Sequence, residues 1–134
     1  MPTLFEKIIN REIPADVLHE DETCIAIRDI APQAPVHALV IPKKEVDRIW
    51  DLEPEELGAL HQFAQRVALA IEDAIPCQRV GVAVIGLEVP HAHVHLIPLQ
   101  SVQDINFERP KLSLSQEALA ETASTLQEAY QRLA

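Results

Sequence analysis

The sequence predicts one α+β domain over residues 1–134, built around an antiparallel sheet of about five strands. Short β-rich runs are joined by short turns, and strands connected in this way are normally antiparallel neighbours. An apolar helical stripe about six turns long interrupts the strands, and a second helical stripe closes the chain. With 134 residues, 48% of them hydrophobic, the chain can bury one core and is too short for two domains.

The first predicted elements are a short helix and a hairpin. Apolar residues within 4–9 recur at helical spacing after Thr3, which can cap the helix, and Pro14 marks the exit from it. Residues 17–20 and 23–28 are strand-like, and the polar residues between them predict a turn.

The middle of the chain alternates between strand and helix. The prolines within 31–35 predict a loop, because each fixes its own φ and disfavours the helical region for its predecessor. Residues 36–41 follow as a buried strand. A long helix is predicted over 57–75, with Pro54 early in its first turn, where proline is tolerated. Residues 80–85 form another β-rich run.

The chain ends in a C-terminal extension, residues 99–134. Its first part, residues 99–112, holds no clear element and predicts a long loop. A second amphipathic helix is predicted to start at Ser115, a suitable N-cap, with an apolar stripe that runs to Leu133.

Charge and composition exclude several classes of protein. The formal net charge of −10 would repel a polyanion, so nucleic acid is not expected as a partner, although a local cluster of imidazoles and backbone amides can still bind one phosphate. The sequence has no apolar run of ~20 residues and starts without the features of a signal peptide, so we expect a cytoplasmic protein with no membrane partner. The two cysteines form neither a metal motif nor a disulfide framework, which fits a reducing compartment.

Three of the six histidines lie within residues 91–98, which we predict to be a strand. Successive side chains of a strand point to opposite faces, so His91, His93 and His95 share one face while the apolar residues between them take the other. Neighbouring imidazoles would stand about 6.5 to 7 Å apart. A single histidine on a strand is usually a packed residue, whereas three in strict alternation predict a functional site.

Two chemistries compete for this row of imidazoles. His-x-His on a strand can hold zinc, but the first and third histidines lie about 13 Å apart along the strand and cannot easily share one ion. A zinc site would need a third ligand from elsewhere and would leave one histidine over. Nucleophilic catalysis, in which one neutral imidazole attacks while its neighbours bind the developing charge, uses all three.

The row resembles the His-φ-His-φ-His-φ-φ signature, φ being apolar, of the histidine triad (HIT) superfamily of nucleotide hydrolases and transferases. Residues 4–9, 12–14 and 29–44 resemble its HINT-like branch, whose members cleave nucleoside phosphoramidates. The resemblance covers residues 3–98 in family order and implies the HIT-like fold.

The resemblance also implies roles for the histidines. The middle one, His93, would be the nucleophile that attacks the α-phosphorus of a nucleotide and forms a nucleotidyl-histidine, which water then hydrolyses. His91, His95 and His37 would surround the same phosphate, stabilise its oxygens and assist the leaving group. This mechanism requires no metal and no other cofactor.

A nucleoside site follows from the same resemblance. Asp29 matches the carboxylate that accepts the two ribose hydroxyls of the substrate. On composition alone, the apolar residues that match the purine pocket would be assigned to the core. They are Leu4, Phe5, Ile8, Ile27 and Ile30.

The chain departs from the family just before the histidines. The HINT-like branch usually carries an Asn-x-Gly segment and a Gly-Gln-Ser run there, which supply donors to the phosphate and the leaving group. Here the asparagine position is Val84, and Glu88 stands near the position of the serine, at the substrate. A carboxylate beside a phosphate is repulsive unless it contacts a histidine or an amine, so the family's recognition of the leaving group is not carried over. The Cys-x-x-Cys zinc site of some members is replaced by residues 3–6.

Taken together, the residues predict an enzyme that cleaves purine nucleoside phosphoramidates or related AMP conjugates. One alternative is a dinucleoside polyphosphate hydrolase, against which the HINT-like first half argues. Another is a nucleotide-binding regulatory module with little turnover, which Val84 and Glu88 favour. The apolar stripe of 57–75 and the run of 80–85 predict a homodimer built on these two elements, as the resemblance also implies.

Overall fold

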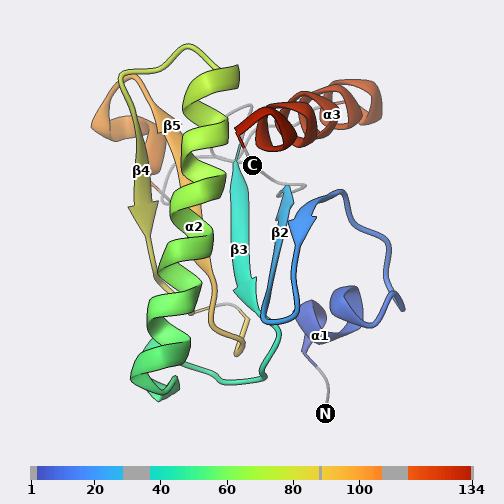
Figure 1. The fold of residues 1–134 in the computed structure, drawn as a ribbon, viewed down its shortest axis with the longest axis vertical. Helices are drawn as coiled ribbons and strands as arrows, with labels where there is room; N and C mark the ends of the chain where they lie inside the picture. The colour runs from blue at the N-terminus through green and yellow to red at the C-terminus, as the bar shows by residue number, and fades with distance from the viewer. Residues whose placement is uncertain (1–2, 29–36, 88, 107–114, 134) are drawn as a thin grey trace.

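A computed structural model describes residues 3–28, 37–87, 89–106 and 115–133 (Figure 1). In this part of the chain, five strands form one sheet in the order β1-β2-β3-β5-β4, and each neighbouring pair is antiparallel. The predicted α+β fold, with its five-stranded sheet, long helix and C-terminal helix, is confirmed. The elements in chain order are α1 (Leu4–Ile9), β1 (Val17–Glu20), β2 (Cys24–Arg28), β3 (Ala38–Pro42), the 3-10 turn η1 (Ile49–Asp51), α2 (Pro54–Ala74), β4 (Arg79–Ala83), β5 (Val94–Leu99), the 3-10 turn η2 (Val102–Ile105) and α3 (Gln116–Leu133).

The two long helices cover one face of the sheet. In Figure 1, α2 runs along the strands, and α3 packs against α2 and β1. Phe63 and Ile71 of α2 are fully buried against the strand residues that point to this face, among them Ala26, Val40 and Leu96. The main hydrophobic core therefore lies between the sheet and these helices.

A second, smaller core cluster lies on the opposite face, where α1 packs. Its buried members are Phe5, Ile8, Ile25, Ile27, Leu39 and Ile41. Strand β2 is consequently buried on both faces, which explains why its sequence shows no clear alternation of apolar and polar residues.

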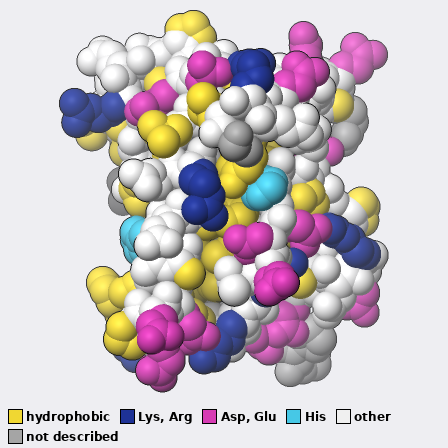
Figure 2. Space-filling view, viewed as in Figure 1, with side chains coloured by type: hydrophobic (Ala, Val, Ile, Leu, Met, Phe, Trp, Pro, Cys, Tyr) yellow, Lys and Arg dark blue, Asp and Glu magenta, His cyan; other side chains and the backbone are white. Residues whose placement is uncertain are grey.

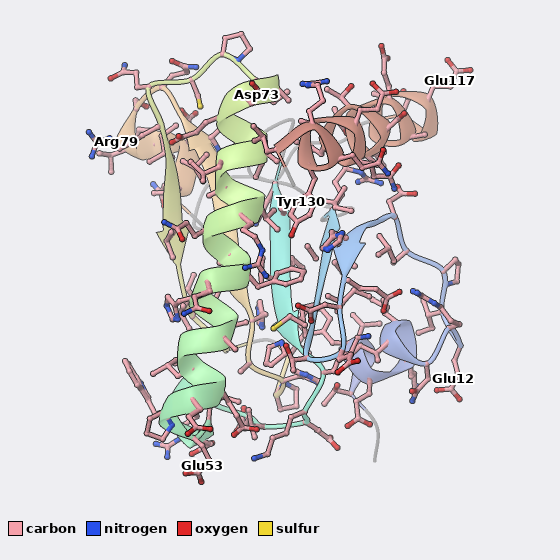
Figure 3. All side chains as sticks on the ribbon, in the orientation of Figure 1. Glu12, Glu53, Asp73, Arg79, Glu117 and Tyr130 are labelled. Atoms are coloured by element: carbon pink, nitrogen blue, oxygen red, sulfur yellow. The ribbon has the colours of Figure 1, made fainter. Side chains whose placement is uncertain are left out.

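Helix α3 is held to the sheet by polar as well as apolar contacts. Tyr130 projects from α3 towards the strands (Figure 3) and stacks on the ring of His19 in β1, with ring centroids 4.0 Å apart. Its hydroxyl accepts a hydrogen bond from Arg66 Nε of α2 at 3.2 Å. Gln127 donates to the backbone carbonyl of Val17 at 2.6 Å. The C-terminal extension thus shares the core of the sheet.

The predicted helix caps are confirmed. Thr3 Oγ1 accepts the backbone N–H of Glu6 at the start of α1, at 3.1 Å. Ser115 caps α3 in the same way, at 3.1 Å. None of the helices in the described part of the chain is both long and apolar enough to pass through a bilayer.

The strand predicted over 91–98 is shorter at its start. β5 begins at Val94, so the prediction is wrong for the first three residues. The backbone N–H of His91 donates to the carbonyl of Val89 at 2.8 Å, and that of Ala92 donates to Val46 at 2.7 Å. These bonds keep the preceding turn outside the ladders that β5 forms with β3 and β4.

Acidic side chains are spread over the surface. Figure 2 shows Asp and Glu in groups on the side from which α2 is seen in Figure 1, with Lys and Arg between them. One such cation, Arg132 of α3, lies 2.6 Å from Asp73 near the end of α2. Exposed pairs of this kind contribute little to stability, so the packing of the core carries most of it.

We expect Phe63→Ala to lower the free energy of unfolding by about 3–5 kcal/mol, because the ring is fully buried between helix and sheet. Urea denaturation at one fixed protein concentration measures the loss. The neighbouring residue Gln62 is exposed on the same helix, so Gln62→Ala is the matched control, with a change within about 0.5 kcal/mol. Equal losses in the two variants would contradict this placement of the core.

Candidate active site

Four buried histidines, which we call the histidine cluster, come together from two strands. His37 directly precedes β3, His91 and His93 precede β5, and His95 lies in β5 opposite Leu39 of β3. Because β3 and β5 pair antiparallel, residues 58 positions apart in the sequence meet at this point. The side chain of His95 projects to the face opposite α2, since its neighbours Val94 and Leu96 face the helices.

His91 has a hydrogen-bond partner at each ring nitrogen. Its Nε2 lies 2.8 Å from the carbonyl oxygen of Pro42, and its Nδ1 lies 2.9 Å from Thr3 Oγ1. A carbonyl can only accept, so Nε2 carries the proton and donates it. In the neutral ring Nδ1 then holds the lone pair and accepts from the Thr3 hydroxyl.

His93 is oriented by the backbone of His91. Its Nδ1 lies 2.7 Å from the His91 carbonyl oxygen and therefore donates its proton there. In the neutral ring this places the lone pair on Nε2, the arrangement that an imidazole nucleophile requires. The ring of Phe5 lies edge-on to His93, with centroids 4.8 Å apart, and fixes the imidazole from the side of α1.

His95 and His37 form a directly bonded pair. His37 Nε2 lies 2.9 Å from His95 Nδ1, so one of the two nitrogens carries the proton that they share. The rings of His93 and His95 are 4.9 Å apart between centroids, closer than the spacing expected from an extended strand. The His93 and His95 rings are therefore close enough to act on the same small group.

The competing interpretation, that the three histidines form a metal site, cannot use His91 as a ligand. Both nitrogens of His91 are already engaged by Pro42 and Thr3, so the lone pair on Nδ1 is used in the hydrogen bond from Thr3 and not offered to an ion. Within the ranges that the structure describes, no group of three or more His, Cys, Asp and Glu side chains is arranged to hold a metal.

The predicted nucleoside residues are only partly described. Phe5, Ile8 and Ile27 are buried in the cluster under α1, beside the histidines, whereas Leu4 is 47% exposed. Three further predicted residues lie outside the described part of the chain. They are Asp29, Ile30 and Glu88.

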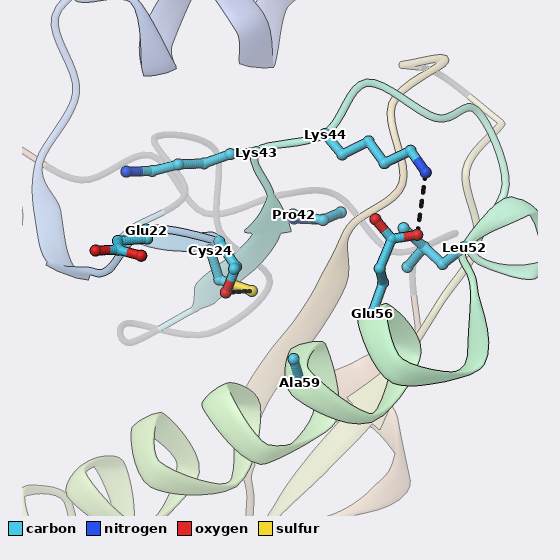
Figure 4. Close-up of a pocket in the computed structure, with 9 residues that line it drawn as sticks. Glu22, Cys24, Pro42, Lys43, Lys44, Leu52, Glu56 and Ala59 are labelled. Carbon is cyan, nitrogen blue, oxygen red and sulfur yellow. Dashed lines mark hydrogen bonds and ion pairs between the residues drawn. The ribbon is translucent and has the colours of Figure 1, made fainter.

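A separate cavity of about 190 Å³ lies between the ends of β2 and β3 and the start of α2 (Figure 4). Lys44 Nζ lies 3.0 Å from Glu56, and Lys43 Nζ lies 2.9 Å from Glu20. The hydrogen bond from Lys43 holds the pKa of the Glu20 carboxyl below its usual range, as expected for an ion pair. The residues described as lining the cavity include none of the four histidines; they are Glu22, Thr23, Cys24, Pro42, Lys43, Lys44, Leu52, Glu56 and Ala59.

Two groups of the site were missed by the sequence analysis. One is the Thr3 hydroxyl, which was expected only as a helix cap, and the other is the Pro42 carbonyl. Thr3 and His91 are 88 positions apart, and a backbone carbonyl carries no residue-specific signal. A search for polar side chains near the row could have found neither.

The sequence and the fold were compared with those of known proteins. Residues 10–102 match the HIT domain family. The chain is 43% identical over 100 residues to a HIT-like protein of Synechocystis, covering 71% of this chain and 88% of the relative. It is 38% identical over 102 residues to the purine nucleoside phosphoramidase of Escherichia coli, covering 71% and 85%. The crystal structure of a HIT-like protein from Bartonella henselae superposes with a TM-score of 0.82 at 32% identity, covering 95% of each chain.

Proposed function

The chain belongs to the HIT domain family, and from this premise we propose that it hydrolyses the phosphoramidate bond of purine nucleoside phosphoramidates or related AMP conjugates. The observation that carries the proposal is the hydrogen bond from His93 Nδ1 to the His91 carbonyl at 2.7 Å, because it sets the tautomer of a nucleophile. The 38% identity to a purine nucleoside phosphoramidase supports the choice of substrate.

In the first step, His93 Nε2 forms a bond to the α-phosphorus while the bond from phosphorus to the amine nitrogen breaks. The amine leaves with the electron pair of that bond and takes up one proton. The product on the protein is a nucleotidyl-histidine, whose Nδ1–H still donates to the His91 carbonyl. That bond stabilises the positive charge that develops on the ring.

In the second step, water attacks the same phosphorus and the bond to Nε2 breaks. The nucleoside monophosphate leaves, and His93 returns to its starting tautomer. The pair of His95 and His37 gives a proton to the amine in the first step and takes one from water in the second. The two steps together consume one water molecule.

The remaining groups act on binding. With His37 donating to His95 Nδ1, His95 presents Nε2–H to the reacting phosphoryl group, and this is the proton that passes to the amine as the phosphorus–nitrogen bond breaks. Phe5, Ile8 and Ile27 provide an apolar wall for the purine. From the resemblance, we assign Asp29 to the ribose hydroxyls and Ile30 and Leu4 to the purine pocket.

Turnover of a substrate panel tests the proposal. We expect the highest kcat/KM on phosphoramidates of adenosine or another purine nucleoside. Faster turnover of diadenosine polyphosphates would replace the proposal with a dinucleoside polyphosphate hydrolase. Micromolar binding of nucleotides without turnover of any member of the panel would favour a regulatory binding module. The replacement of the family's polar residues by Val84 and Glu88 would then account for the lack of turnover.

We expect His93→Ala and His93→Asn to lose turnover by more than about a thousandfold, because His93 Nε2 is the atom proposed to form the covalent intermediate. Steady-state kinetics on an adenosine phosphoramidate measures the loss, and trapping of an acid-labile nucleotidyl adduct on wild-type His93 would support the assignment directly. His61 is exposed on α2 and its Nδ1 lies 3.1 Å from the Leu57 carbonyl, so His61→Ala is the matched control with unchanged turnover. Turnover by folded His93→Ala at the wild-type rate would refute the nucleophile.

Activity should survive exhaustive dialysis against a chelator, because imidazoles perform each proposed step and both nitrogens of His91 are engaged within the protein. Metal content by mass spectrometry and kcat before and after dialysis are the measurements. Loss of activity on chelation, with recovery on addition of zinc alone, would favour the metal mechanism.

We further propose a homodimer with a two-fold interface on α2 and β4. Strand β4 is at an edge of the sheet, and its neighbourhood exposes Val82, Val84 and Ile85 by 57%, 42% and 43%. A second copy would cover this edge and these side chains.

Light scattering at micromolar concentration should therefore give twice the chain mass, and Val82→Glu should give one chain mass. Ala120→Glu is the control, because Ala120 is exposed near the start of α3, at the end of this helix that lies away from α2 and β4 (Figure 3). A wild-type protein that is monomeric at this concentration would contradict the proposed assembly.

A further inference from the structure

We propose that Thr3 is a positioning residue for the histidine cluster, through a hydrogen bond from its hydroxyl to His91 Nδ1. Thr3 lies outside the matched family region, residues 10–102, and sequence analysis gave it only the role of a helix cap. The kinetic test of this inference rests on the proposed function, because it measures phosphoramidate turnover. The geometry of the inference rests only on the hydrogen bonds of Thr3 and His91.

The direction of each hydrogen bond around Thr3 is determined by its partners. Thr3 Oγ1 accepts the backbone N–H of Glu6 at 3.1 Å, so its own proton remains available to donate. The second partner is His91 Nδ1 at 2.9 Å, which holds a lone pair because Nε2–H donates to Pro42. The hydroxyl therefore accepts at the helix and donates at the histidine.

This bond matters because the ring it holds is fully buried. His91 is 0% exposed and Thr3 only 8%, so water cannot easily replace the hydroxyl. A buried acceptor without a donor is costly, and the ring would relieve that cost by rotating away from residue 3, after which its proton can settle on either nitrogen. Rotation breaks the bond from Nε2 to the Pro42 carbonyl.

The effect would reach His93 through the backbone of His91. The carbonyl of His91 accepts the Nδ1–H of His93 at 2.7 Å and so sets the nucleophile's tautomer and aim. A displaced His91 moves this carbonyl. Thr3 also caps α1, and Phe5 of this helix contacts the His93 ring, with centroids 4.8 Å apart. The cap and the ring contact therefore both act on His93.

Thr3→Val, Thr3→Ser and Ser115→Ala test whether the Thr3 hydroxyl supports catalysis beyond what the loss of a helix cap elsewhere would do. Valine has the shape of threonine without the hydroxyl, serine keeps the hydroxyl, and Ser115→Ala removes the corresponding cap of α3, far from the histidines in the sequence. We expect Thr3→Val to lower kcat by about 100-fold with KM close to wild type, because the group positions the nucleophile and does not bind substrate. Thr3→Ser should restore kcat, and Ser115→Ala should leave it unchanged.

Nitrogen-15 spectra of the histidine rings provide a readout that does not depend on turnover. In the wild type we expect His91 protonated at Nε2 and His93 protonated at Nδ1. In Thr3→Val the His91 signals should show a different tautomer or exchange between tautomers. These spectra test the inference even if no phosphoramidate is cleaved, an outcome that would count against the proposed function alone.

Several results would overturn the role of Thr3. They are an unchanged kcat in folded Thr3→Val, an equal loss of kcat in Ser115→Ala, and no recovery in Thr3→Ser. A wild-type spectrum with His91 protonated at Nδ1 and not at Nε2 would do so as well, because the hydroxyl would then be accepting. That last measurement needs no variant and stands even if Thr3→Val does not fold.

Discussion

The burial of four imidazole rings is the constraint on which the site depends. A buried ring nitrogen without a partner costs about 1–3 kcal/mol, so the fold must bring a suitable group to each one. The structure does this for His91 with a helix cap from the start of the chain and a carbonyl from the end of β3. The position of α1 and the pairing of β3 with β5 therefore belong to the site as much as to the fold.

The two faces of the sheet have different roles, one holding the main core and the other the histidines. The face under α2 and α3 holds the larger apolar core, which includes Phe63 and Ile71. The other face holds the smaller cluster under α1, next to the histidines. Because β2, β3 and β5 are buried on both sides, the strands that support the site have little freedom to shift. A rigid support of this kind suits hydrogen bonds that must hold a proton on one chosen nitrogen.

Local patterns in the sequence predicted the elements, and distant contacts account for what they missed. The stripe of α2, the Ser115 cap and the alternating histidines depend on residues within a few turns of one another, so they could be read directly. The start of β5 was misplaced because the N–H of Ala92 bonds to Val46, far away in the sequence. The partnership of Thr3 with His91 depends on how α1 docks, which no local pattern records. Candidate site residues could thus be proposed from the sequence, but the hydrogen-bond directions among the described ones could not.

The choice of imidazoles bears on how an acidic protein can act on a nucleotide. The net charge is −10, and Lys43 and Lys44, two cations in the described part of the chain, are engaged by carboxylates and do not form a phosphate site. Neutral imidazole N–H groups bind a ground-state phosphate less strongly than ammonium groups do. In the proposed reaction their hydrogen bonds strengthen as charge spreads onto the phosphoryl oxygens, so more of their energy is expressed in the transition state. Differential binding of this kind raises kcat, and it depends on donors whose protons are already aimed before the substrate arrives.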